Sequence, residues 1–141
     1  MTPDVCTLNI DFRTTPIFDD EAAATLLDHV TTRVDERWPD TRPTLVQLTI
    51  RWPAYALAAD SRLRTTLLRV AHTFGVGAEP KIAGPSNIGN YLAGRGIAAT
   101  AGFGVTYSGL HASDERIQLD TIPTIQAIYH ATLLSLLTRT Q

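Results

Sequence analysis

The sequence has little of the chemistry that defines several common classes of protein. Cys6 is its single cysteine, which excludes a disulfide framework and a cysteine-rich zinc module and makes a reducing cytoplasm the expected compartment. No apolar run approaches the roughly 20 residues of a membrane span. The N-terminus lacks the basic region of a secretory signal peptide. The net charge of −2 argues against a nucleic-acid-binding protein, so we expect neither membrane nor nucleic acid as a partner.

What the chain does have is the length and composition of a globular domain, with 141 residues of which 44% are hydrophobic and 18% charged. Apolar and polar residues alternate over residues 5–13 and again over 45–52, and this period predicts a half-buried strand in each segment. Between them lies an acidic first turn at residues 19–21, followed by apolar residues at helical spacing, which predicts a helix. Two strands and one helix are too few elements to make a stable independent domain, so we expect this unit to be incomplete.

The second part of the chain predicts two longer helices. The first runs from about residue 61 to 74, and Gly75 stands where a left-handed C-terminal cap belongs. The second begins near Thr121, with Pro123 in its first turn, and carries a broad apolar face to the end of the chain.

Shorter elements are expected between these two helices. Ser86 can cap a short helix over residues 87–93, which should bury its apolar side chains Ile88, Tyr91 and Leu92. Residues 97–101 are apolar and predict a short buried strand, and a glycine-rich loop follows over 102–110.

Four histidines offer the only imidazoles. His29, His72 and His130 lie in predicted helices with no metal-binding spacing between any pair, so we interpret them as structural. His111 lies in an irregular loop after glycines and before two carboxylates, a setting that suits either a functional residue or an ordinary turn. One imidazole is not a metal site, since zinc needs about three or four protein ligands.

Two further features admit both a functional and a structural interpretation. The run over residues 84–90 (GPSNIGN) is a glycine turn opening a helix, whose free backbone N–H groups suit a carboxylate or serve only as a capped turn. Arg13, on the polar face of the first strand, is either an exposed charge or a clamp for a carboxylate. Cys6 lies on the apolar face and is expected in the core rather than as a nucleophile.

Several runs, taken in order, resemble one known family. Residues 3–13 (PDVCTLNIDFR) look like a strand of the lid, or dimerisation, domain of the acetylornithine deacetylase, succinyl-diaminopimelate desuccinylase and aminoacylase family, the M-twenty metallopeptidases. Residues 84–92 (GPSNIGNYL), 96–104 (GIAATAGFG) and 111–115 (HASDE) are similar to the end of that family's catalytic domain. There the usual form is Gly-x-Ser-Asp, a strand, and His-x-x-x-Glu. The resemblance extends over essentially the whole chain.

The resemblance implies an α/β protein with two parts. Residues 1–53 would form a partial α+β lid (strand–helix–strand), and residues 54–141 the C-terminal α/β section of a zinc-hydrolase catalytic domain. The family hydrolyses amide bonds of N-acyl amino acids or small peptides through a water held by one or two zinc ions, and it dimerises through the lid. By this match His111 would be a metal ligand. The residues that would bind substrate are Arg13, Ser86, Asn87, Gly89 and Asn90.

The chain departs from the family pattern in its metal ligands. The sequence contains no His-x-Asp motif, bridging Asp, Glu-Glu pair with the general base, or further carboxylate ligand matching the family, and Asn87 stands where Asp is common. Because hydrolysis needs a base and enough ligands to activate water, we expect a C-terminal fragment that is inactive alone. The alternatives are a partner-binding or dimerisation module, whose strand edges pair with another chain, and one half of a two-chain hydrolase.

Overall fold

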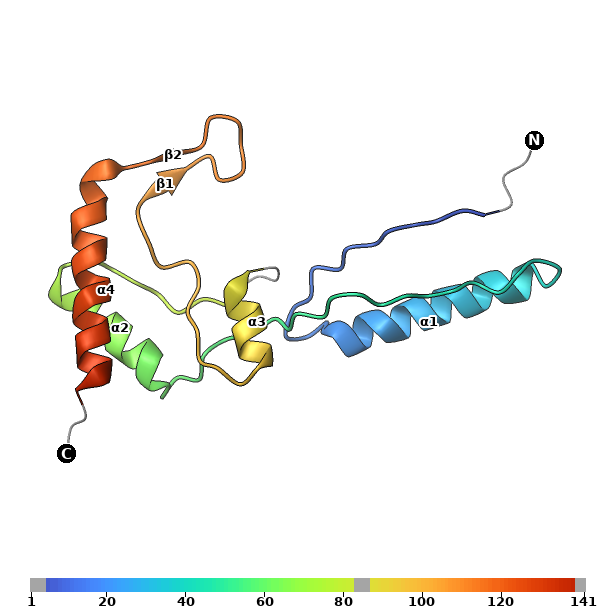
Figure 1. Cartoon of the computed structure of the whole chain (residues 1–141), viewed down its shortest axis with the longest axis horizontal. Helices are drawn as coiled ribbons and strands as arrows, with labels where there is room; N and C mark the ends of the chain where they lie inside the picture. Colours follow the sequence, from blue (N-terminus) through green and yellow to red (C-terminus); the bar gives the residue numbers. More distant parts are fainter. Residues whose placement is uncertain (1–4, 83–86, 139–141) are drawn as a thin grey trace.

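A computed structural model describes residues 5–82 and 87–138 of the chain. Within these ranges it contains four α-helices, a short 3₁₀ helix and one two-stranded antiparallel sheet (Figure 1). The elements are α1 (Asp20–Arg37), α2 (Arg62–Thr73), α3 (Ile88–Gly94), β1 (Tyr107–Ser108), β2 (Arg116–Ile117), η1 (Leu119–Thr121) and α4 (Ile122–Leu137). The broad α/β class is confirmed, and these elements identify no more specific fold. No helix in the described ranges has both the length and the apolar character to cross a membrane.

Helix α1 begins where the sequence predicts it. Asp19 caps the helix by accepting a hydrogen bond from the Ala22 N–H at 2.9 Å, and acidic residues occupy the first turn, where the helix dipole favours them. Ala23 is the one buried residue of the helix. Most of the apolar stripe is therefore open to solvent, with Leu26, Val30 and Val34 between 43% and 47% exposed.

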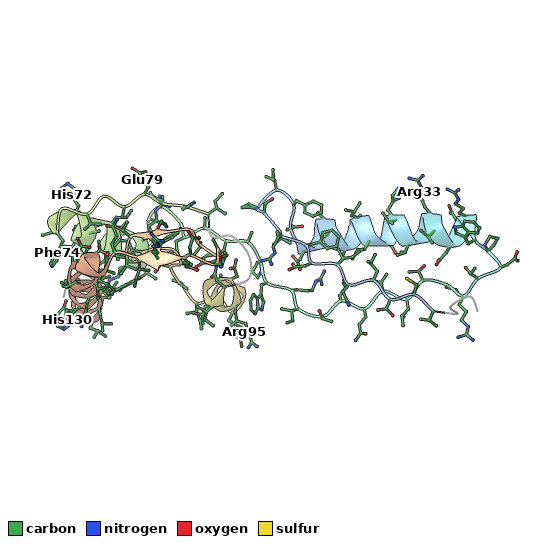
Figure 2. The ribbon with its side chains drawn as sticks, turned by 90° about the horizontal axis from the view of Figure 1, so that it is seen from above. Arg33, His72, Phe74, Glu79, Arg95 and His130 are labelled. Carbon is green, nitrogen blue, oxygen red and sulfur yellow. The ribbon has the colours of Figure 1, made fainter. Side chains whose placement is uncertain are left out.

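Residues 5–13 and 45–52 are extended alongside α1, but neither forms a strand. Figure 1 shows both segments running in the same direction, opposite to α1, and Figure 2 shows them on the same side of that helix. No main-chain hydrogen bond reaches residues 5–12 or 45–52 within the described structure. The prediction of a half-buried strand in each segment is wrong, because a ladder needs a neighbouring strand and neither segment has one in the described structure. Cys6, expected in the core, is exposed for the same reason.

The second segment is fastened to α1 near both of its ends. The main-chain N–H and the side-chain hydroxyl of Thr44 donate to Asp35 Oδ1 at 3.0 and 2.6 Å. Toward the other end of the helix, Arg51 Nε lies 3.2 Å from Asp20 Oδ2. At the end of the first segment, just before the helix begins, the Phe12 and Phe18 rings pack with their centroids 6.3 Å apart.

The apolar core lies where α2 packs on α4, and both helices are confirmed. Its buried residues are Leu67, Val70, Ala71, Ile125 and Ile128. Helix α2 ends at a Gly75 with φ of +72°, as the sequence predicts, and α4 has a proline in its first turn. The expected strand at 97–101 has no ladder and is irregular chain.

The short helix α3 is present, but its N-cap and its buried residues differ from those predicted. Its N-cap is Asn87, whereas the predicted cap Ser86 lies outside the described residues. The predicted burial is wrong for Ile88, which is 68% exposed, and for Tyr91, which is 39% exposed, whereas Leu92 is half-buried. The face turned inward instead carries Gly89 and Asn90, since this helix approaches main chain rather than an apolar layer.

Candidate functional site

The candidate metal ligand His111 lies in the loop of a hairpin formed by β1 and β2, in which Tyr107 pairs with Ile117. No pattern in the sequence predicts this hairpin, because two-residue strands are too short to show alternation. His111 has a φ of +67° and is the one non-glycine residue of the described chain in the left-handed region. That conformation costs most residues about 1–2 kcal/mol. The Glu115 carboxylate offsets part of the cost by accepting the His111 N–H at 3.2 Å.

The His111 imidazole is exposed and makes no hydrogen bond in the part of the chain that the structure describes. It is therefore available to a ligand. No group of three or more His, Cys, Asp or Glu side chains in the described ranges could hold a metal ion. Because zinc takes three or four protein ligands, these residues do not make a zinc site by themselves, and His111 would supply one ligand of a larger set.

The other three histidines lie on helices rather than in the hairpin loop that carries His111. His72 and His130 project from the outer surface of α2 and α4 (Figure 2), and both are exposed. His29 is exposed on α1. All three lie on helices, as the sequence predicts, and their interpretation as structural residues stays a prediction.

Two of the predicted substrate-binding residues, Asn87 and Asn90, cap α3 reciprocally. Asn87 Oδ1 accepts the Asn90 N–H, and Asn90 Oδ1 accepts the Asn87 N–H, each at 3.2 Å. Asn90 is fully buried and its Nδ2 donates to the Pro53 carbonyl at 2.7 Å. These bonds satisfy the helix N-terminus and tie it to the chain before α2, so the amide groups have a structural role in this state.

Gly89 is buried beside a tyrosine that the sequence interpretation missed. A Cβ built at Gly89 would collide with the Tyr55 hydroxyl and would lie 2.8 Å from Asn87 Oδ1, so only glycine fits. The Tyr55 hydroxyl donates to the Ala99 carbonyl at 2.9 Å, and burial raises the pKa of Tyr55. Tyr55 lies in a connector with no hydrophobic period, which left no signal for its packing.

Arg13 lies on the first extended segment, where its Nη2 is 2.9 Å from Asp11 Oδ2 and both side chains are more than 60% exposed. The structure thus places the predicted residues at three locations. Asn87, Gly89 and Asn90 lie together at α3, Arg13 on the first segment, and His111 in the hairpin loop, which Figure 1 shows apart from α3.

A cavity with a volume of about 830 Å³ lies beside α2 and α4. Its apolar lining includes Leu67, Phe103 and Ile125, and Arg64 and Lys81 contribute charge. None of the described candidate residues at α3, the first segment or the hairpin loop lines it. The cavity is therefore separate from the site that the motifs predict.

Comparison with known proteins returned no matching family model, no matching curated protein and no matching solved structure. The resemblance to the M-twenty metallopeptidases therefore stays a prediction from the motifs. The function must be argued from the residues and their arrangement.

Proposed function

We propose that this chain supplies the C-terminal part of a zinc-dependent amidohydrolase that acts on N-acyl amino acids or small peptides. The observation that carries the proposal is the order of the motifs, from the first extended segment through residues 84–92 to His111. The exposed imidazole without a hydrogen-bond partner in the described chain supports a ligand role for His111. The remaining ligands and the general base would come from polypeptide outside this sequence, so the chain alone is inactive.

Each predicted residue has a definable task in this proposal. His111 would offer one ligand, and Glu115 would position it by holding its main-chain N–H. The exposed guanidinium of Arg13 suits the substrate carboxylate, for which a planar fork is the best match. Asn87, Gly89 and Asn90, with Ser86, would form one wall of the substrate pocket by fixing α3.

The test is reconstitution with the missing part. The chain would be co-expressed with a polypeptide from the same genome that carries the His-x-Asp and Glu-Glu motifs, and release of acetate or succinate from N-acyl amino acids would be measured with Zn²⁺. We expect activity from the pair and none from the chain alone. His111→Ala should lower kcat/KM by at least about 10-fold, because losing a metal ligand costs no less than losing a residue that orients one.

His130→Ala is the matched control, since this imidazole is also exposed but lies on α4. It should leave the activity of the pair unchanged. Full activity of the pair with His111→Ala, or robust zinc-dependent hydrolysis by the purified chain alone, would refute the proposal.

A second candidate function is a partner-binding or dimerisation module, with a homodimer formed through residues 1–53. The exposure of Leu26, Val30 and Val34 on α1 favours it, because a helix stripe of this kind is normally covered. Sedimentation equilibrium at micromolar concentration tests the homodimer directly, since the mass should be twice 15.4 kDa. The cytoplasm is our proposed compartment for either function.

A further inference from the structure

The cavity of about 830 Å³ beside α2 and α4 has the size of a small-molecule site. Pockets that bind small ligands usually have volumes of about 300–1,000 Å³ and a mostly apolar lining. One turn of α2 and the beginning of α4 line this cavity, together with the segments 55–57, 76–82 and 100–107. Its apolar side chains are mainly aliphatic and include Leu67, Leu68, Val76, Ile82, Phe103 and Ile125. The cavity therefore suits a ligand with an apolar body.

Four charged residues of the described chain line the cavity, and Arg64 is the one best placed to meet a ligand inside it. Arg64 is half-buried, whereas Lys81, Glu79 and Asp120 are exposed. Asp120 lies in the first turn of η1, where the helix dipole favours a negative charge. Figure 2 shows Glu79 projecting outward, away from α4. The charge that remains for a ligand is therefore positive, and it favours an anionic group at Arg64.

The Arg64 guanidinium is held in place, but it has no counter-ion in the described structure. Its Nη1 donates to the carbonyl of Leu57, another lining residue, at 2.9 Å. No carboxylate in the described ranges forms an ion pair with Arg64. A guanidinium stays charged when it is half-buried, and its remaining N–H groups match the two oxygens of a carboxylate. Because the bond to Leu57 already orders the side chain, binding an anion there requires little further ordering.

The charge and the lining together specify one class of ligand. A carboxylate carries one negative charge, whereas a phosphate monoester carries nearly two and is harder to place beside apolar side chains. A flexible tail can follow walls of irregular chain, whereas a planar ring packs best against flat aromatic faces. We propose that this cavity binds a medium-chain fatty acid, with its carboxylate at Arg64 and its unbranched tail along Leu67 and Ile125. None of the described residues assigned to the hydrolase site lines the cavity, so this inference does not rest on the proposed function.

Isothermal titration calorimetry of the full chain with octanoate, decanoate and dodecanoate tests the proposal. We expect one acid to bind per chain. Two added methylenes should lower the Kd by about 15-fold, because each buried methylene is worth about fourfold in affinity. Dodecanoate should bind with a Kd of about 1 mM or tighter, the affinity that fourteen non-hydrogen atoms give at the ligand efficiency of drug-sized molecules. A Kd that is independent of tail length, or no saturable binding of dodecanoate, would overturn the proposal.

The requirement for a negative charge is tested with a ligand of the same tail and opposite charge. Decyltrimethylammonium should bind at least about tenfold more weakly than decanoate, because it cannot accept the hydrogen bonds of a charged donor. Equal affinity for the two ligands would mean that the cavity selects only an apolar tail, and would refute the role of Arg64.

Variants of Arg64 test the position of the carboxylate. Arg64→Gln removes the charge and keeps an amide donor, and it should weaken decanoate binding at least about tenfold. Arg64→Lys keeps the charge and should bind decanoate more tightly than Arg64→Gln. Arg69→Gln is the matched control, since Arg69 is exposed on the same helix and does not line the cavity, and it should leave the Kd unchanged.

Ala101→Trp tests the position of the tail independently of the charge. Ala101 lines the cavity and is exposed, so a larger side chain takes up cavity volume without entering the core. Displacing the tail by about two methylenes should weaken decanoate binding at least about tenfold. Ala98→Trp is the control, because Ala98 is exposed and does not line the cavity. Unchanged decanoate binding by Arg64→Gln or by Ala101→Trp would place the acid outside this cavity and overturn the proposal.

Discussion

One methyl group at Gly89 is expected to destabilise the contact between α3 and the connector before α2. In Gly89→Ala the new Cβ meets the Tyr55 hydroxyl and lies 2.8 Å from Asn87 Oδ1. Overpacking of this kind costs about 1–3 kcal/mol, and the better helix propensity of alanine returns up to about 1 kcal/mol. We therefore expect the free energy of unfolding to fall by about 1–2 kcal/mol.

A second substitution tests whether the tyrosine hydroxyl is the cause. Tyr55→Phe removes the obstructing oxygen and loses the bond to the Ala99 carbonyl, at a cost of about 1 kcal/mol. In that background Gly89→Ala should cost about 1 kcal/mol less than in the natural chain. Some cost remains, since Tyr55 Cζ would still lie 3.2 Å from the new Cβ.

Urea unfolding followed by Trp52 fluorescence suits this cycle, because the Trp52 ring contacts Tyr91 of α3 with centroids 6.5 Å apart. The exposed Trp38 is replaced by Phe in every variant to remove its signal. Gly77→Ala is the control, since a Cβ there meets nothing within 4 Å. If Gly89→Ala and Gly77→Ala have equal effects, the close approach of Tyr55 does not explain the glycine, and the reasoning fails.

Three further perturbations probe the core and the cap. Ile128 is fully buried in the centre of α4, and Ile128→Ala should lower the free energy of unfolding in urea by about 2–5 kcal/mol. Leu133 is 54% exposed on the same helix, and Leu133→Ala should lower it by less than about 1 kcal/mol. Similar values for the two variants would contradict the assigned core. Asn90→Ala should cost about 1–3 kcal/mol and speed amide exchange in α3, because it leaves the Pro53 carbonyl without its donor. Burial raises the pKa of Tyr129, so the unfolded chain loses this phenolic proton first. Stability is then full below the ordinary pKa of 10.0 and falls as pH rises past it, and Tyr129→Phe should reduce that fall in pH-dependent unfolding.

The helices could be predicted from the sequence because their hydrogen bonds are local. The Asp19 cap, the acidic first turn of α1 and Gly75 after α2 each act within a few residues of the helix they delimit. The alternation over 5–13 and 45–52 identified extended chain correctly. It could not reveal whether a neighbour exists to complete a ladder, because pairing depends on residues distant in sequence.

The position of the candidate site residues could be predicted better than the roles that they have in the structure. Helix α3 begins close to the predicted position, with Asn87 as its N-cap, yet the burial of Asn90 was hidden because a polar residue gives no core signal. Its carbonyl partner at Pro53 is 37 residues away. The hairpin that carries His111 was invisible for a different reason, since its strands are only two residues each.

The packing of α2 on α4 also sets an order of events during synthesis. The apolar face of α2 leaves the ribosome before the residues of α4 that cover it, and about 60 residues separate the starts of the two helices. At a synthesis rate of about 5–20 residues per second, the apolar face of α2 stays exposed for roughly 3–12 seconds before α4 has been synthesised far enough to pack on it. The nascent chain therefore presents Leu67 and Val70 to chaperones throughout this interval, whereas α1 can form as soon as it emerges.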